Sequence, residues 1–321
     1  MAQAISRHRA CVAATHVNPE GDAIGSLLAL TLGLEQLGMQ VWPTLAEPLP
    51  PNYAFLPGAD RLSTTLPDPL PALAIVLDCD GPSRLGPLEA PLLRAPELLD
   101  IDHHSTGKVF GARHWLDAEA AATGEMVEVL LRELGVRLTP EIALNLYAAI
   151  LTDTGRFSFA NTTSRSLESA ARMVAAGAQP VVIYRNLYES KPAASLHLLG
   201  EALVTLRTEG RLAWAALSQE AFFRSGAERA ETEGIIDSIR AVRGVELGML
   251  CTQQPDGSVR ASLRSRGRVD VARLALQFGG GGHPRAAGCT LPGPLPQAVD
   301  RLVAAARQAL EQADRDALAG D

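Results

Sequence analysis

The segment Asp100-Ile101-Asp102-His103-His104 constrains this chain more than any other stretch. It follows a short apolar run, Leu98-Leu99, of the kind that forms a buried strand, and so predicts carboxylates and imidazoles where that strand ends. Neighbouring side chains on extended backbone point in opposite directions, so His103 could bind a metal while His104 faces a substrate. An isolated His-His pair is more often a surface or hydrogen-bonded pair, so the rest of the chain must distinguish these interpretations.

Strand-like and helix-like segments alternate through the N-terminal part. The strands are expected over residues 9–15, 40–44, 73–77 and 98–101, and the helices over residues 22–37, 118–134 and 140–151. Pro140 suits the first turn of the last of these helices, with Thr139 as its cap. Alternation of this kind predicts an α/β fold with a parallel sheet covered by helices on both faces.

Polar residues gather where these predicted elements end. His16, Glu20 and Asp22 lie in the loop after the first strand, Asp78 follows the third strand, and Asp153 follows the helix that begins at Pro140. Each has an ordinary structural alternative, since aspartates cap helices and form turns. However, ligands of parallel sheets collect beyond the carboxyl ends of the strands, which is where these side chains are expected to meet.

Together, these segments would place two or three histidines and at least four carboxylates at one edge of one sheet. Oxygen-rich sets with a few imidazoles suit Mn²⁺ or Mg²⁺ better than structural zinc. So many acidic groups repel one another unless cations lie between them. Two metals roughly 3.5–4 Å apart, bridged by one carboxylate, are the usual arrangement for phosphoester hydrolysis. The pattern therefore predicts a two-metal phosphoesterase.

At this point the chain resembles the DHH phosphoesterases. The motifs that carry the resemblance are His16-x-x-x-Glu20-x-Asp22, Asp78, Asp102-His103-His104 and Asp153-Thr154-Gly155. The resemblance implies that His16, Glu20 and Asp78 hold one metal, normally Mn²⁺, although Mg²⁺ or Co²⁺ could replace it. It also implies that Asp22, Asp78, His103 and Asp153 hold the second metal, which makes Asp78 the bridge.

The resemblance also implies which residues act beside the metals. His104 would face the substrate phosphate, and Asp102 would orient its neighbours. One departure from the usual pattern is Glu20, where the family more often has Asp, and its longer side chain leaves open whether Glu20 binds a metal directly.

The C-terminal half is expected to form a second, smaller α/β domain. We expect a catalytic domain over residues 1–190, a linker over 191–202 that begins with the break at Lys191-Pro192, and the second domain over 203–321. Its expected strands are residues 203–207, 212–217, 246–252 and 258–263, the first two forming a hairpin, followed by a long Ala-rich helix from Leu295.

The most informative stretch of this half is Gly279-Gly280-Gly281-Gly282-His283-Pro284-Arg285. Glycines alone could form a flexible linker, and no Lys-Ser/Thr follows as in a P-loop. Successive backbone N–H groups can surround an anion, and the basic residues directly after them favour phosphate binding. The stretch resembles the DHH-associated substrate-binding domain. The substrate-binding residues implied are Gly280, Gly281, Gly282, His283 and Arg285, with Arg264 on a strand face shared with Arg260 and Ser262.

Size and domain order are similar to those of small bacterial family members that degrade very short RNA (nanoRNA) to mononucleotides and convert 3′-phosphoadenosine 5′-phosphate (pAp) to AMP. Within the same chemistry, the alternatives are a RecJ-like single-strand exonuclease and a pApA or cyclic-dinucleotide phosphodiesterase. The exonuclease usually has further domains, for which no residues remain, and related pyrophosphatases lack the glycine-rich loop. A nucleotide-sensing binding protein on the same fold is the non-enzymatic alternative.

The composition of the chain limits which binding partners and which cellular location we expect. A net charge of −7 over 321 residues argues against a protein that coats long nucleic acid, and it suits short single-stranded RNA or DNA and nucleotides such as pAp. No apolar stretch is suited to a signal peptide or a membrane span, so we expect a cytoplasmic location without membrane partners. The four cysteines are far apart and predict neither disulfides nor a zinc ribbon. The oligomeric state stays open, a homodimer included.

Overall fold

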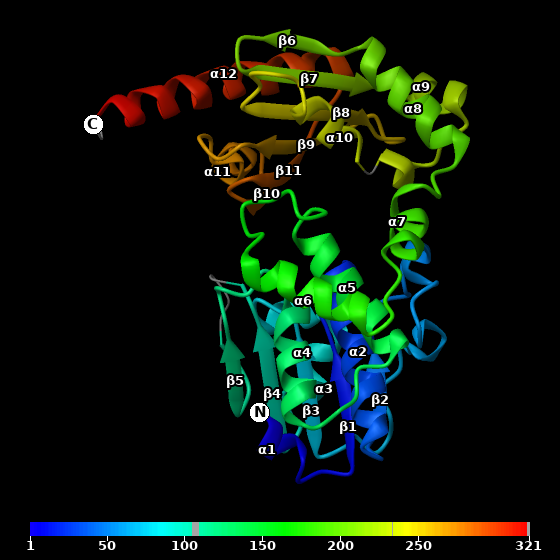
Figure 1. Cartoon of the computed structure of the whole chain (residues 1–321). Helices are drawn as coiled ribbons and strands as arrows, with labels where there is room; N and C mark the ends of the chain where they lie inside the picture. The colour runs from blue at the N-terminus through cyan, green and yellow to red at the C-terminus, as the bar shows by residue number, and fades with distance from the viewer. Residues whose placement is uncertain (105–108, 233, 320–321) are drawn as a thin grey trace. The chain divides into compact units, whose positions relative to one another are not determined.

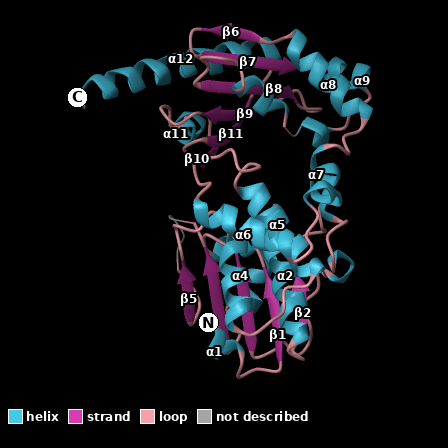
Figure 2. Ribbon diagram, viewed as in Figure 1, coloured by secondary structure: helices cyan, strands magenta, loops and turns pink. Residues whose placement is uncertain are grey.

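The computed structural model describes residues 1–104, 109–232 and 234–319. The chain divides into two compact units, residues 1–190 and 191–321, which are described separately below. Figure 1 follows the chain through both units, and Figure 2 distinguishes the helices from the strands.

The first unit is built on a five-stranded sheet in the order β2-β1-β3-β4-β5. Its strands are β1 (Ala10–Ala14), β2 (Gln40–Thr44), β3 (Leu73–Leu77), β4 (Glu97–Asp102) and β5 (Arg113–Leu116). All neighbouring strands are parallel, as the alternating pattern predicts. β5 was not expected, because its exposed residues do not alternate in the way a half-buried strand does.

The helical elements of this unit are α1 (Ala2–Ile5), α2 (Gly21–Gln36), α3 (Glu89–Leu92), α4 (Thr123–Glu133), α5 (Pro140–Asp153), α6 (Ser164–Ala175) and α7 (Pro180–Tyr188), with the 3₁₀ turns η1 (Pro51–Tyr53), η2 (Ala59–Arg61) and η3 (Pro82–Leu88). The helix α5 begins at Pro140, and its Thr139 cap accepts a hydrogen bond from the N–H of Ile142, as expected.

Both faces of the sheet are covered, because successive strand residues are buried on opposite sides. On one face, Ile75 and Ile101 pack in a core with residues of α2, α4 and α5. On the other face, Val76 packs with Leu88 of η3 and Leu92 of α3. The expected parallel sheet with helices on both faces is therefore confirmed.

The second unit contains a six-stranded mixed sheet in the order β10-β11-β9-β8-β7-β6. Its strands are β6 (Arg207–Glu209), β7 (Leu212–Leu217), β8 (Leu247–Gln253), β9 (Val259–Ser265), β10 (Gly281–His283) and β11 (Ala286–Leu291). Its helical elements are α8 (Ala193–Val204), α9 (Gln219–Ser225), η4 (Arg229–Thr232), α10 (Ile235–Arg240), α11 (Val271–Leu276) and α12 (Leu295–Ala319).

One sheet face of this unit packs on α11 and α12, and the other on α8, α9 and α10. The expected hairpin is present, since β6 and β7 are antiparallel. Its first strand was placed too early, because Leu203 and Val204 continue α8 and β6 begins only at Arg207. Most of the stretch expected as a linker is also part of α8, whose Leu198 and Ala202 are fully buried in the second unit.

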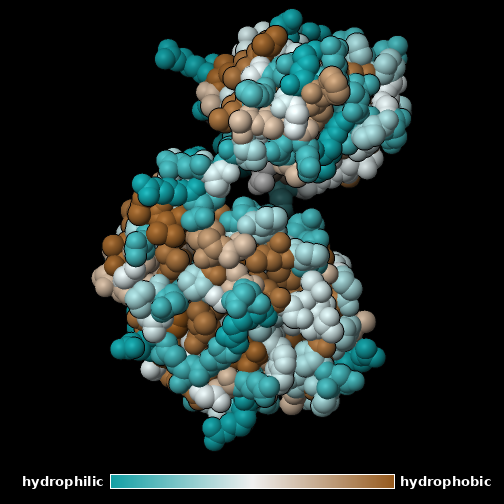
Figure 3. Space-filling model, turned by 90° about the vertical axis from the view of Figure 1, so that its right-hand side faces the viewer, coloured by the Kyte–Doolittle hydropathy of each residue, from teal (hydrophilic) through white to brown (hydrophobic). Residues whose placement is uncertain are grey.

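No helix in the described part of the chain is long and apolar enough to cross a membrane. The four cysteines are buried and unpaired, as their spacing predicts. On the face of the first unit that Figure 3 turns to the viewer, hydrophobic residues gather in patches among hydrophilic ones.

Candidate metal centre

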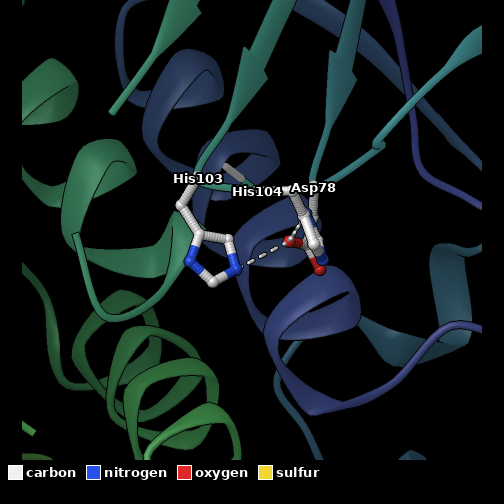
Figure 4. Close-up of side chains that lie close together, drawn as sticks. All are labelled: Asp78, His103 and His104. Atoms are coloured by element: carbon white, nitrogen blue, oxygen red, sulfur yellow. Dashed lines mark ion pairs between the residues drawn. The ribbon is translucent and has the colours of Figure 1, made fainter. Parts of the chain in front are cut away.

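Asp78 lies at the centre of the polar cluster in the first unit. It directly follows β3, and its backbone adopts a left-handed conformation with φ of 58°. A non-glycine residue rarely adopts this conformation outside sites where the surrounding structure enforces it. The side chain is buried and points toward two histidines that follow β4, His103 and His104 (Figure 4).

Three imidazoles surround the Asp78 carboxylate. Its Oδ2 atom lies 3.6 Å from Nε2 of His16, whereas its Oδ1 atom lies 3.5 Å from Nε2 of His103 and 3.8 Å from Nδ1 of His104. The two carboxylate oxygens thus face different histidines. This is the arrangement in which one carboxylate can bridge two cations.

His103 also connects Asp78 to two further carboxylates. Its Nε2 atom lies 3.7 Å from Oδ2 of Asp22 and 3.7 Å from Oδ2 of Asp153. The ring is fixed by its other nitrogen, since Nδ1 lies 3.2 Å from the carbonyl oxygen of Ala120. Donation from Nδ1 to that carbonyl leaves the Nε2 lone pair free toward the carboxylates. Within the described residues, Asp22, His103 and Asp153 form one group that could hold a metal, and Asp78, His103 and His104 form another.

The carboxylate of Asp22 is held by the N-terminus of α4. Its Oδ2 accepts a hydrogen bond of 2.6 Å from the N–H of Thr123, and its Oδ1 accepts one of 2.9 Å from the N–H of Gly124. The Ser26 hydroxyl also donates to Oδ1 over 2.9 Å. Asp22 therefore does serve a helix terminus, but that of α4 rather than that of its own helix.

The charges in this cluster fit a cation. Burial, together with the charges of Asp78 and Asp153, raises the pKa of Asp22 well above its usual range. Burial raises the pKa of Asp153 to about 6, although His103 partly opposes this, and the Asp78 charge adds to it. Burial works against charge on Asp78 as well, but the three histidines outweigh it and lower the pKa of Asp78. Divalent cations would relieve this repulsion, and the oxygen and imidazole donors are those that Mn²⁺ and Mg²⁺ accept.

Asp102 pairs with His104. The Oδ1 atom of Asp102 lies 2.6 Å from Nδ1 of His104 and also accepts a hydrogen bond from its backbone N–H. Burial lowers the pKa of His104, but this hydrogen bond and the charges of Asp78, Asp102 and Asp80 outweigh it and raise the pKa to about 9. The raised pKa favours the protonated form of His104, which suits an anionic substrate.

Glu20 and Asp100 lie outside the two groups that could hold a metal. Glu20 is exposed at the start of α2, and its charge contributes to the raised pKa of Asp153. Asp100 is buried within β4, and among the described residues its Oδ1 has no hydrogen-bond partner. Among the contacts of the described residues, therefore, Asp102 of β4 contacts His104, whereas Asp100 of the same strand contacts neither His103 nor His104.

The sequence did not reveal the residues that support these carboxylates. The Thr123 hydroxyl donates to Oδ1 of Asp78 over 3.0 Å. The Asn161 amide donates to Oδ2 of Asp153 over 3.3 Å and to two nearby carbonyl oxygens. The sequence holds one weak signal for Thr123. The preceding Ala120-Ala121-Ala122 offers α4 no side-chain cap, so the first N–H groups of this helix need an acceptor from elsewhere in the fold.

Two of the three predicted basic residues, Arg264 and His283, lie in one row of the second unit's sheet. Arg264 pairs with Ala286 of β11, and Ala286 pairs with His283 of β10, so the three form one row across the sheet. Paired residues share a face, and Leu263 and Ala287 of the next row are buried on the opposite face. Arg264 and His283 therefore lie on the same face of the sheet, a proximity that the alternation along β9 alone does not predict.

The glycine run forms the end of α11 and the start of a β-hairpin. The N–H groups of Gly279 and Gly280 donate to carbonyl oxygens of α11, so these two do not form the anion-binding loop that we expected. A Cβ on Gly280 would collide with Gly288 and Cys289, whereas one on Gly281 would meet no atom within 4 Å. Gly280 thus allows close strand packing, and Gly281 leaves open space beside the row of basic residues.

Comparison with known proteins agrees with the division of the chain into two units. Residues 11–150 match the N-terminal domain of the DHH family, and residues 212–312 match the DHHA1 domain. The chain is 38% identical to the bifunctional oligoribonuclease and PAP phosphatase NrnA of Thermus thermophilus over 94% of this chain and 90% of that protein. It is 28% identical to the protein of the same name from Bacillus subtilis, over 89% of this chain and 91% of that protein.

A solved structure is similar over nearly the whole chain. The exopolyphosphatase-related protein of Bacteroides fragilis has a TM-score of 0.86 and 25% sequence identity, and the match covers 97% of this chain and 94% of that one.

Proposed function

Because this chain belongs to the DHH family of phosphoesterases and carries a DHHA1 domain, we propose that it hydrolyses short oligoribonucleotides to mononucleotides and pAp to AMP. The observation that carries this proposal is the convergence of His16, His103 and His104 on the carboxylate of Asp78. The names of its relatives from Thermus thermophilus and Bacillus subtilis support the choice of substrates.

Two divalent cations, Mn²⁺ in the first instance, would be held by the carboxylates and imidazoles around Asp78. The residues proposed as ligands are His16, Glu20, Asp22, Asp78, His103 and Asp153. When bound, such cations lower the pKa of a water molecule and neutralise charge on the phosphoryl oxygens. The His16 ring is held with Nε2 toward Asp78, since Nδ1 lies 2.8 Å from the carbonyl oxygen of Val17 and 2.9 Å from the Arg84 guanidinium.

His104 would bind the phosphoryl group that is attacked. Its imidazolium is preorganised by Asp102, which holds Nδ1 and leaves Nε2 available to donate to a phosphoryl oxygen. A fixed donor of this kind stabilises the negative charge that grows on phosphorus-bound oxygens in the transition state. Asp102 then acts on the substrate through His104.

The second unit would bind the nucleotide. Arg264 and His283 share one face of the sheet, and no described carboxylate forms an ion pair with Arg264, His283 or Arg285. An arginine without a carboxylate partner can bind phosphate without first breaking an ion pair, and the ring of His283 can donate a hydrogen bond to it. Gly281 adds open space next to them. A cytoplasmic location, where short RNA fragments arise, goes with this proposal.

The test is a rate assay on metal-free protein with and without added Mn²⁺. Phosphate release from pAp and mononucleotide release from RNA of two, three, five and twenty-four nucleotides are measured. We expect turnover of pAp and of the shortest RNAs, falling with length. Preference for the 24-mer would favour the RecJ-like alternative. A cyclic dinucleotide and pApA are added as substrates, and turnover of these two without turnover of pAp or of the three-nucleotide RNA would favour the phosphodiesterase. Binding without turnover would favour the nucleotide sensor.

A further inference from the structure

We propose that Thr123 is a positioning residue that sets the relative orientation of the two carboxylates Asp22 and Asp78 for metal binding. This inference rests on the proposed function, because it assumes that these carboxylates bind cations. Thr123 is fully buried at the first position of α4 and contacts both side chains, one through its backbone and the other through its hydroxyl.

The backbone contact arises because α4 has no cap of its own. Its N-cap residue is Ala122, whose side chain accepts no hydrogen bond, so the first N–H groups of this eleven-residue helix need another acceptor. Asp22 supplies both of its oxygens to the N–H groups of Thr123 and Gly124. A carboxylate is also favoured at the positive end of a helix. The position of α4 therefore fixes the plane of the Asp22 carboxylate.

Gly124 keeps this contact close. A Cβ at that position would lie 2.6 Å from Cβ of Ala149 and 3.5 Å from Oδ1 of Asp22. A side chain there would push the start of α4 away from α5, and with it the donors to Asp22. The absence of a side chain thus lets the start of α4 lie close to α5 and to Asp22.

The hydroxyl contact fixes the other carboxylate. Thr123 Oγ1 donates to Oδ1 of Asp78 over 3.0 Å. A hydroxyl at the first position of a helix has no preceding helical turn whose carbonyl it could bond instead. Each carboxylate oxygen has two lone pairs, so Oδ1 can accept this hydrogen bond and still bind a cation. The hydroxyl therefore selects one rotation of the Asp78 carboxylate, with Oδ2 toward His16 and Oδ1 toward His103.

Because Asp22 is anchored to the backbone of Thr123 and Asp78 to its hydroxyl, a single residue links carboxylates that come from α2 and from the end of β3. A residue that only filled the core would need its methyl group and not its hydroxyl. Positioning through the hydroxyl and packing through the methyl group can be separated by variants that remove only one of these two groups.

The experiment measures Mn²⁺ binding to metal-free protein by titration calorimetry for wild type, Thr123→Val and Thr123→Ser. The valine keeps the shape and the backbone N–H but loses the hydroxyl, and the serine restores it. We expect Thr123→Val to weaken Mn²⁺ binding about 10–100-fold, the usual effect of removing a group that orients a ligand, and Thr123→Ser to bind within about threefold of wild type. Thr123→Ala gives a second hydroxyl-free variant should the valine fail to fold.

The melting temperature of the metal-free proteins separates positioning from packing. A purely structural role predicts a lower melting temperature for Thr123→Val and Thr123→Ala with unchanged Mn²⁺ affinity, which would overturn the inference. Failure of Thr123→Ser to restore affinity would overturn it as well. A wild-type protein that binds no Mn²⁺ would instead refute the proposed function, so the two failures are distinguishable.

Discussion

The Oδ1 atom of Asp78 lies 3.5 Å from Nε2 of His103, although the two residues follow different strands and are separated by a long stretch of sequence. Their proximity follows from the sheet, because β3 and β4 are parallel neighbours and their carboxyl ends reach the same edge. His16 arrives from the end of β1, the neighbour of β3 on its other side. Asp78 at the end of β3 therefore lies between His16, which follows one neighbouring strand, and His103, which follows the other.

Removing divalent cations should destabilise the first unit. Without them, Asp22, Asp78 and Asp153 face one another in a buried site. A ligand present at about 100 times its dissociation constant stabilises the folded state by about 2.7 kcal/mol. We expect added Mn²⁺ to raise the melting temperature of EDTA-treated protein in a concentration-dependent way, measured by scanning calorimetry. A melting temperature that does not respond to Mn²⁺ would contradict the assignment.

Replacing His104 should slow turnover without removing a metal. In His104→Ala the fixed donor to the phosphoryl group is lost, so we expect kcat for pAp to fall about 10²–10³-fold. Metal content, measured by atomic absorption, should stay at the wild-type value. Loss of one metal would show instead that His104 is a ligand, which the group of Asp78, His103 and His104 also allows.

Replacing the basic residues of the second unit should weaken substrate binding and leave the metals in place. We expect His283→Ala and Arg264→Ala each to raise KM for a dinucleotide by about 10–150-fold, since a charge-assisted hydrogen bond contributes about 1.5–3 kcal/mol. The matched control is Arg260→Ala, which removes an exposed arginine from the same face of β9. Equal effects of Arg260→Ala and Arg264→Ala would indicate a general charge effect rather than a binding site.

Asp100 should make stability depend on pH. Burial, with the charge of Asp102 added, raises the pKa of Asp100 from 3.8 to about 7. Between these values the folded state keeps a proton that the unfolded state has lost, so the free energy of unfolding should fall as pH rises, by at most about 1.4 kcal/mol per pH unit. The measurement is chemical denaturation of the metal-free proteins across this pH range. The free energy of unfolding of Asp100→Asn should not show the decline that Asp100 causes, and at pH 8 it should be higher than that of the wild type. Parallel profiles for the two proteins would refute the prediction.

The sequence predicted four strands of this sheet, and it predicted that Asp22, Asp78, His103 and Asp153 lie close together, because both follow from local rules; the exposed strand β5 was missed. The apolar runs of β3 and β4 mark buried strands, and polar residues directly after them must lie at the carboxyl edge. The contacts of Thr123 and Asn161 could not be predicted in this way, because they depend on how α4 and the segment after α5 pack against that edge.

The run Gly279-Gly280-Gly281-Gly282 shows a second limit of prediction from the sequence. Its composition predicts free N–H groups, but the structure uses those of Gly279 and Gly280 to end α11. Glycine at Gly280 is required by the close approach of Gly288 and Cys289, a contact between strands that the run itself does not encode. Alternation along β9 did predict that Arg264 shares a face with Arg260 and Ser262, because the period of a strand is local, but the pairing that adds His283 to this face depends on β10 and β11.

The most direct test of the account is electron paramagnetic resonance of the Mn²⁺-loaded protein, compared with Asp78→Asn. If the Asp78 carboxylate bridges two cations, the wild-type spectrum should show two exchange-coupled Mn²⁺ ions per chain, as expected for metals about 3.5–4 Å apart. Asp78→Asn should lose the coupling together with the hydrolysis of pAp. Two uncoupled ions in the wild type, or a coupled pair and substantial activity in Asp78→Asn, would contradict the account.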